Sequence, residues 1–201
     1  MSPTRIIYLL ATLLVILTGL ASYLAVSMYM NRDGSGTIIS DAGIKIGGPF
    51  ELVDQNGNTV TQATYAGKPY LMFFGFTHCP DICPTKLAEI SVVLEKLGDQ
   101  SSDLNVLFVS VDPERDTPQV LNEYVEIFHP QITGLSGSVE TIADVARSHR
   151  AYYRKVDLDD GDYTVDHSTV VYLFDQDGQF VSPINIEADP AEVADKLRAV
   201  L

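Results

Sequence analysis

The two cysteines of the chain, Cys79 and Cys83, lie four positions apart at the boundary between two structural patterns. The apolar run Tyr70–Phe76 before them predicts a buried strand, and a helical pattern begins near Asp81 or Pro84. The unpaired N–H groups and partial positive charge of a helix N-terminus favour thiolate over thiol. One turn of helix also brings positions i and i+4 onto the same face. We therefore expect a pair of acidic thiols directed at one point in space.

The N-terminal segment predicts a membrane anchor. Ile6–Met30 carries no charged side chain, and as a helix it is long enough to cross a bilayer core of about 30 Å. Arg5 precedes the run, which favours a cytoplasmic N-terminus. A cleaved signal peptide is the alternative, although its apolar stretch would be shorter. We expect an uncleaved anchor over residues 1–30, a flexible linker over 31–43, and a folded domain over 44–201 on the extracytoplasmic side, where disulfides persist.

The acidic balance of the chain limits its partners. With 201 residues and a formal net charge of −14, the protein lacks the clustered Lys and Arg that phosphate binding requires. We therefore expect no nucleic-acid partner. An acidic surface suits docking on a basic protein instead.

Strand and helix patterns alternate along the folded part. Strands are expected at 104–111, 132–135, 152–156, 164–174 with an interruption near His167, and 180–186. Helices are expected over 87–97, from Asp116 to Phe128, from Ser138 to about His149, and from Asp189 onward. The turns at Asn56-Gly57 and Asp175–Gly178 predict hairpins. The alternation implies an α/β domain with a mixed central sheet flanked by helices. A dithiol after an early strand, with a final hairpin and helix, is the thioredoxin-like arrangement.

His167 is the third candidate donor, because it lies where a loop meets an apolar strand. Two thiolates and one imidazole form a soft donor set that suits Cu(I), and that also holds Cu(II) if a further ligand or water joins. Zinc accepts the same set. The predicted anchor and the thiol chemistry favour copper. Asp166 is a candidate for orienting the imidazole, since outer groups commonly orient metal-binding histidines.

The same residues have plainer interpretations. The cysteines could form a structural disulfide, which is ordinary in an oxidising compartment. Closing so small a loop stabilises a protein by only about 2 kcal/mol, and a bridge between i and i+4 on a regular helix is near the upper limit of Cα separation. We expect such a bond to be readily reduced. Taken alone, His167 would be a structural histidine, and only the nearby dithiol makes it a ligand candidate.

The other histidines are interpreted as structural. His78 is adjacent to Cys79, but neighbours in extended chain point opposite ways, so we expect it to be structural or to support the donors indirectly. His129 and His149 are expected to lie at helix C-termini, where a histidine is electrostatically favoured without any function.

Several aspartates near the cysteines and strand ends also have structural explanations. Asp81 is expected to cap the helix rather than tune the thiols. Asp112 and Asp116 follow a strand, where α/β sites gather, but Asp-Pro is also an ordinary turn. The acidic run Asp157–Asp162 is expected to be a solvated loop, with partner docking as the lesser alternative.

Four blocks of sequence are specific enough to compare with known families. They are GGPF at 47–50, FGFTHCPDICP at 74–84, SVDPERDT at 110–117 and DHS at 166–168. In this order they resemble the Sco/SenC family of membrane-anchored copper proteins. The resemblance extends over about residues 44–201 and includes the block with both cysteines.

The resemblance implies a thioredoxin-like domain that helps to assemble the dinuclear copper centre in subunit II of cytochrome c oxidase. It would act as copper donor, as reductant of that subunit's cysteines, or both, in the bacterial periplasm or the mitochondrial intermembrane space. The copper ligands of the family correspond to Cys79, Cys83 and His167. Thioredoxins separate their cysteines by two residues, and the third intervening residue here shifts the sulfur geometry toward a chelate.

Three rival functions use the same residues. In a metal-independent thiol-disulfide oxidoreductase, Cys79 would attack, Cys83 would resolve, and His167 would be nearly dispensable. A peroxide-reducing enzyme on the same fold is the least favoured, because Pro80 and Pro84 do not fit the expected surroundings of its nucleophile. A redox sensor that signals through the anchor shares every sequence feature with a copper-assembly protein.

Overall fold

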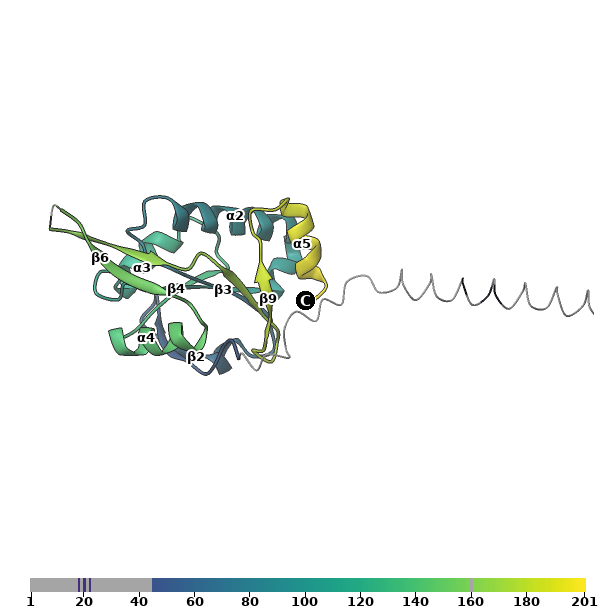
Figure 1. Cartoon of the computed structure of the whole chain (residues 1–201), viewed down its shortest axis with the longest axis horizontal. Helices are drawn as coiled ribbons and strands as arrows, with labels where there is room; N and C mark the ends of the chain where they lie inside the picture. Colours follow the sequence, from purple (N-terminus) through teal and green to yellow (C-terminus); the bar gives the residue numbers. More distant parts are fainter. Residues whose placement is uncertain (1–17, 19, 21, 23–44, 160) are drawn as a thin grey trace, which may run out of the picture. The chain divides into compact units, whose positions relative to one another are not determined.

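The computed structural model describes residues 18, 20, 22, 45–159 and 161–201 (Figure 1). Within those residues, none of the helices is long and apolar enough to cross a membrane. The expected anchor at 1–30 and linker at 31–43 lie outside the described residues, apart from the three isolated positions. Residues Lys45–Leu201 form one compact unit.

A mixed seven-stranded sheet forms the centre of this unit, in the order β2-β1-β5-β4-β3-β8-β9. Its strands are β1 Glu51–Asp54, β2 Thr59–Thr61, β3 Tyr70–Gly75, β4 Asn105–Ser110, β5 Ile132–Ser136, β8 Val171–Phe174 and β9 Phe180–Ile184. The β3–β4 and β4–β5 pairs are parallel, and the other pairs are antiparallel. The predicted α/β class with a mixed central sheet is confirmed.

Helices cover both faces of the sheet. They are α2 Ile82–Leu97, α3 Pro118–Val125, α4 Val139–Ser148 and α5 Pro190–Arg198, with short 3₁₀ helices η1 Gln62–Tyr65 and η2 Gly98–Asp103. Helices α2 and α5 lie side by side on one face, and α4 lies on the other (Figure 1). The expected starts are confirmed by side-chain caps at Thr117, Ser138 and Asp189. Helix α3 ends at Val125, so the expectation that His129 closes a helix is wrong.

Strand β3 positions the cysteines. Every residue of β3 is buried, as expected for a strand that is covered on both faces and therefore reads as a continuous apolar run. Because β3 and β4 are parallel, their carboxyl ends open at the same edge of the sheet. The backbone N–H of Val111 donates to the carbonyl of Gly75 at 2.8 Å. The loop that carries the cysteines and the loop after β4 therefore lie side by side.

A separate two-stranded sheet carries the expected histidine. Within the described part of the chain, strands β6 Tyr153–Asp157 and β7 Tyr163–His167 pair with each other and with no other strand, as an antiparallel hairpin that extends from the body of the domain (Figure 1). The predicted interruption near His167 is confirmed, because β8 begins at Val171 after a short irregular stretch.

Candidate metal centre

The two cysteines lie on either side of the start of helix α2. Since α2 begins at Ile82, Cys79 belongs to the turn after β3, and Cys83 lies in the first helical turn. The backbone N–H of Cys83 donates to Sγ of Cys79 at 3.4 Å. Both residues are free thiols, with Cys83 buried and Cys79 partly exposed. As predicted, the sulfur of Cys79 faces N–H groups at a helix N-terminus.

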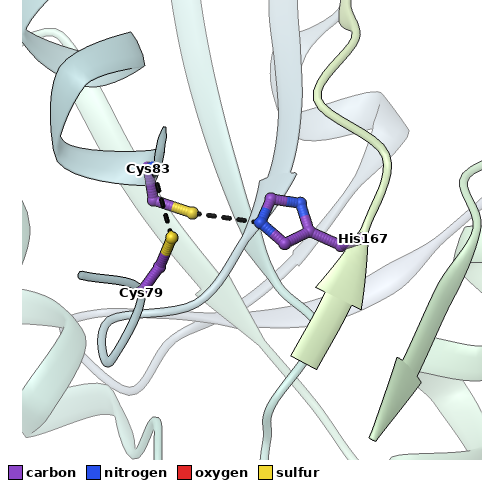
Figure 2. A group of neighbouring side chains, drawn as sticks. All are labelled: Cys79, Cys83 and His167. Atoms are coloured by element: carbon purple, nitrogen blue, oxygen red, sulfur yellow. Dashed lines mark hydrogen bonds between the residues drawn. The ribbon is translucent and has the colours of Figure 1, made fainter. Parts of the chain in front are cut away.

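His167 completes a cluster of three donor atoms. It ends strand β7, and its Nε2 lies 3.3 Å from Sγ of Cys83 (Figure 2). The two sulfurs and a ring nitrogen all lie within 4.8 Å of one another. The structure therefore brings together the three residues expected from the sequence, although His167 is separated from the cysteines by more than eighty positions.

The imidazole of His167 is oriented by a backbone carbonyl. Its Nδ1 lies 2.9 Å from the carbonyl oxygen of Ser168. Because a carbonyl only accepts, Nδ1 carries the hydrogen, and the lone pair of Nε2 faces the sulfurs. The expectation that Asp166 orients this ring is wrong, since its carboxylate accepts from Arg154 at 2.9 Å instead. A sequence pattern has no signal for a carbonyl contact of this kind.

Two aromatic side chains of the body also support the imidazole. The rings of Phe73 and Phe76 contact His167 edge-on, with centroids 6.1 and 5.7 Å from that of the imidazole. Both phenylalanines are buried. The imidazole of His167, although it belongs to the hairpin, therefore packs against the end of β3.

The two thiols differ in acidity, which corrects the expectation of two acidic cysteines. The hydrogen bond from the Cys83 thiol is the main cause that lowers the pKa of Cys79 from 9.0 to about 4, against the opposing effect of burial. Backbone N–H groups of Cys83 and Asp81 lower it further. The pKa of Cys83 is raised, first by that same hydrogen bond and then by burial. One thiolate and one thiol are therefore expected in the metal-free protein.

Asp81 contributes through its backbone rather than its side chain. It occupies the N-cap position of α2, but its carboxylate makes no capping hydrogen bond, so the predicted side-chain cap is wrong. Its N–H instead helps to lower the pKa of Cys79. The sulfur of Cys79 takes the place that a capping oxygen usually holds.

Gly75 allows the sulfur of Cys83 to lie against the end of β3. A Cβ at this position would lie 2.7 Å from Sγ of Cys83 and 2.6 Å from Cε2 of Phe108. Neither atom can move easily, because both residues are buried. Sequence reasoning missed this role, and the only available signal was a glycine at the end of an apolar strand.

Asp116 joins the cysteine turn to the loop after β4. It is 0% exposed and accepts hydrogen bonds from Oγ1 of Thr77 at 2.6 Å, from the N–H of Thr77 at 3.0 Å and from Oγ of Ser110 at 2.6 Å. His78 is exposed, with Nδ1 3.8 Å from the same carboxylate. It lies outside the donor cluster, as expected. The sequence placed Asp116 at a strand end but gave no indication of its partners.

The remaining residues singled out from the sequence do not join the cluster. His149 is buried between Phe74 and Phe174, with ring centroids 5.7 and 5.5 Å away, which confirms a structural role. His129 accepts from the N–H of Gln131. The described residues of the acidic run 157–162 are largely exposed, in agreement with a solvated loop.

The donor set fits a soft metal ion. Thiolate sulfur and neutral imidazole nitrogen bind Cu(I) and Zn²⁺, and Cu(II) accepts the same donors with a further ligand. The tautomer fixed by Ser168 leaves Nε2 free to bind, and the pKa of Cys79 is low enough to supply a thiolate without a metal. The cluster thus has the chemistry of a metal-binding site.

Comparison with known proteins identifies the family of the chain. A sequence model of the SCO1/SenC family matches residues 40–201. The chain belongs to the SCO1/SenC family. This confirms the resemblance to Sco/SenC proteins drawn from the four sequence blocks.

Members of the SCO1/SenC family match in both sequence and structure. Protein SCO1 homolog 1, mitochondrial, of Arabidopsis thaliana is 50% identical over 68% of this chain and 41% of its own length. A SCO2-like protein of Rickettsia prowazekii is 43% identical over 75% of this chain and 74% of its length. The structure of Bradyrhizobium japonicum ScoI with copper bound is 52% identical, covers 78% of this chain and 99% of that chain, and gives a TM-score of 0.75.

Proposed function

We propose that this chain is a membrane-anchored copper-binding protein that assists assembly of the dinuclear copper centre of cytochrome c oxidase subunit II. Copper is then cargo, which the protein holds through Cys79, Cys83 and His167. The observation that carries the proposal is the arrangement of two sulfurs and one ring nitrogen within 4.8 Å. Membership of the SCO1/SenC family and the copper-bound ScoI of Bradyrhizobium japonicum support copper over zinc.

Each donor has a separate role in holding copper. Cys79 offers a thiolate at neutral pH, whereas Cys83 must lose a proton when the metal binds. Two thiolates suffice for Cu(I), and the nitrogen of His167 adds the donor that Cu(II) requires. Binding therefore releases one proton, chiefly from Cys83.

The same cysteines form a redox gate on copper loading. Removal of two electrons by an oxidant, together with the thiol proton, forms the Sγ–Sγ bond between Cys79 and Cys83. A disulfide offers no thiolate, so the oxidised protein cannot hold copper in this way. Copper loading then depends on the cysteines being reduced.

Thiol reduction of the oxidase subunit is the second candidate function, and the unequal thiols favour it. The partly exposed Cys79 thiolate would attack a partner disulfide and form a mixed disulfide. The buried Cys83 would then attack Cys79, so that two electrons pass to the partner, which leaves with two thiols. This chain would retain the disulfide. His167 contributes no atom to this exchange.

The proposed location follows from the sequence of the first thirty residues. An anchor over 1–30 with a cytoplasmic N-terminus, followed by a linker over 31–43, would place the domain of 44–201 on the extracytoplasmic side. In that compartment copper and a disulfide partner are both accessible to the domain. A membrane partner such as an oxidase subunit suits a tethered domain.

Anaerobic copper titration of the reduced 201-residue chain, as wild type and His167→Ala, tests the proposal. We expect one tightly held Cu(I) in both, and a thiolate-to-Cu(II) charge-transfer band in the wild type only. The loss of Cu(II) affinity should exceed the roughly 10–100-fold that loss of an outer hydrogen-bond partner costs. A competition experiment with Zn²⁺ compares the affinities of the site for copper and for zinc.

Two outcomes would contradict copper binding by these three residues. Equal losses of Cu(I) and Cu(II) affinity in His167→Ala would show that His167 is not the additional donor for Cu(II). The second outcome is that no stoichiometric copper binds, while wild type and His167→Ala reduce a partner disulfide equally fast. Thiol reduction would then be the function.

A further inference from the structure

The nitrogen donor and the sulfur donors of the cluster belong to different parts of the domain. Cys79 and Cys83 follow β3, in the central sheet, whereas His167 ends β7, in a hairpin that pairs with no strand of that sheet. No ladder hydrogen bond therefore fixes the distance between Nε2 and the sulfurs. The contacts between the hairpin and the rest of the domain therefore influence how closely Nε2 of His167 approaches Sγ of Cys83.

Three side chains fasten the hairpin β6–β7 to the loop after β4. The hydroxyl of Tyr163, at the start of β7, donates to Oδ1 of Asp112 at 2.8 Å. Arg115 donates from Nε to Oδ2 of Asp112 at 2.5 Å and from Nη1 to the carbonyl of Tyr163 at 3.0 Å. Its guanidinium also lies 3.7 Å from the centroid of the Tyr163 ring. We refer to Asp112, Arg115 and Tyr163 together as the latch.

The latch is shielded well enough to hold a fixed geometry. Asp112 is 3% exposed, and Arg115 is partly buried beneath the tyrosine ring. Ion pairs on an open surface contribute little, but this one combines hydrogen bonds to a buried carboxylate with stacking on an aromatic ring. Lys155 of the same hairpin lies 3.7 Å from the ring centroid as well, and pairs with Glu114 of the same loop.

The loop that carries the latch also holds the turn before the cysteines. Asp116 follows Arg115 directly and accepts two hydrogen bonds from Thr77, two positions before Cys79. One short loop therefore contacts the sulfur side of the cluster through Asp116 and the nitrogen side through Asp112 and Arg115. The turn before the cysteines and the hairpin are therefore joined by hydrogen bonds to the same loop.

We infer that Asp112, Arg115 and Tyr163 are positioning residues for His167, which hold the hairpin so that Nε2 stays within reach of both sulfurs. The inference rests on the proposed function, in which His167 is the nitrogen donor for Cu(II). The latch touches none of the donor atoms and acts through the backbone of β7. Phe73 and Phe76 contact the imidazole directly, so loss of the latch weakens the nitrogen ligand without removing it.

Two substitutions test the latch in the reduced 201-residue chain. Tyr163→Phe removes the hydroxyl that reaches Asp112 and keeps the ring, and Arg115→Gln removes the guanidinium. We expect each to weaken Cu(II) about tenfold, in the range typical of outer partners of metal ligands, and to weaken the thiolate-to-Cu(II) band. Cu(I) affinity, measured by competition with a chelator, should change less than about twofold, because two thiolates hold it.

A copper-free measurement separates positioning from general stability. In the metal-free protein we expect weaker nuclear Overhauser contacts between the rings of His167 and Phe76 in both latch variants. The matched controls are Tyr152→Phe and Arg154→Gln, which make the same chemical changes on exposed side chains beside or within the hairpin. Both should keep the contacts and the copper affinities of the wild type.

The outcomes distinguish failure of the latch from failure of the proposed function. His167→Ala is measured in the same series. If it loses Cu(II) while Tyr163→Phe and Arg115→Gln bind like the controls, the latch has no positioning role and the proposed ligands stand. If the latch variants lose Cu(I) and Cu(II) equally, the latch supports the whole fold and not His167. If His167→Ala keeps full Cu(II) affinity, the ligand assignment and the latch both fail.

Discussion

At the scale of single residues, Cys79 and Cys83 show how position makes identical side chains different. Cys79 lies before the helix, partly exposed, where its sulfur accepts from N–H groups and from the thiol of Cys83. Cys83 is buried beside that thiolate, and a second negative charge there would be costly. Cys79 is therefore the reactive thiolate of the metal-free protein, and Cys83 is expected to keep its proton.

The unequal thiols predict selective alkylation of the reduced, metal-free chain. The pKa of Cys79 is lowered to about 4, so its reactive thiolate persists in mild acid and is lost only as the pH falls through that value. Iodoacetamide should therefore modify Cys79 before Cys83 at pH 6, at a rate close to that at pH 8. Peptide mass spectrometry over time measures both sites.

The Cys83→Ala variant is the control for the cause of this acidity. It removes the hydrogen bond that contributes most to the low pKa of Cys79, so alkylation of Cys79 should slow markedly at pH 6 and recover at higher pH. Faster labelling of Cys83 in the wild type would contradict the assignment. The assignment would also be contradicted if the alkylation rate of Cys79 in the wild type already fell as the pH is lowered from 9 to 8.

At the scale of elements, the close approach of strand β3 and helix α2 determines where the sulfur of Cys83 lies. The approach is possible because Gly75 has no side chain where the strand ends. Phe108 of the parallel strand β4 fills the neighbouring space. The sulfur of Cys83 is therefore held by packed elements, which fix a donor atom more closely than a free loop does.

Gly75→Ala should disturb both the core and the metal centre. The added methyl would lie 2.7 Å from the sulfur of Cys83 and 2.6 Å from the ring of Phe108, so one of them must shift. We expect a loss of about 1–3 kcal/mol in the free energy of unfolding, as overpacked cores typically show. Cys83 is a ligand for both oxidation states in the proposed function, so the Cu(I) and Cu(II) affinities should fall together. Urea denaturation and chelator competition measure the two effects.

Gly134→Ala is the matched control, since it overpacks a different part of the same sheet. Its methyl would lie 3.2 Å from Cβ of Leu121, on helix α3, and contacts none of the donors. It should cost stability and leave copper affinity unchanged. Wild-type copper binding by Gly75→Ala would show that the sulfur of Cys83 tolerates displacement, against the role given to this glycine.

The elements themselves were largely predictable because their signals are local. The apolar run of β3, the caps at Thr117 and Ser138, and the turn at Asn56-Gly57 depend on a few adjacent residues, and the structure agrees with each. The grouping of Cys79, Cys83 and His167 was anticipated from their chemistry together with a family resemblance.

The features that could not be predicted from the sequence depend on contacts between distant segments. Tyr163 meets Asp112 across fifty-one positions, and no periodicity records such a pair. The unequal acidity of the cysteines depends first on the hydrogen bond between them and then on burial, which two identical residues in one motif do not reveal. The carbonyl of Ser168 was missed because backbone acceptors carry no residue type.

At the scale of the whole molecule, one buried histidine links the stability of the core to pH. His149 caps helix α4 and lies between Phe74 and Phe174, where its Nδ1 donates to the carbonyl of Val145 at 2.8 Å. Among the described residues, nothing pairs with its Nε2. A proton on Nε2 would therefore place an unpaired charge in the core.

Burial lowers the pKa of His149 below its ordinary value of 6.5, so the folded domain should lose stability in mild acid. The unfolded chain takes up a proton near pH 6.5, whereas the folded protein does so only at lower pH. Between these values the unfolded state binds more protons, and stability rises with pH. The stabilisation that neutral His149 contributes is fully present above pH 6.5 and declines below it. Urea midpoints of the metal-free protein between pH 7.5 and pH 5 should fall accordingly.

His149→Gln tests whether this residue causes the decline, because an amide can still donate to Val145 but does not titrate in this range. We expect the variant to be less stable at pH 7.5, where it loses ring packing, and to show a shallower loss between pH 7.5 and pH 5. The same change at the partly exposed His129 is the matched control and should keep the wild-type slope. Equal slopes for His149→Gln and wild type would assign the acid sensitivity to other groups and leave the buried imidazole a packing residue only.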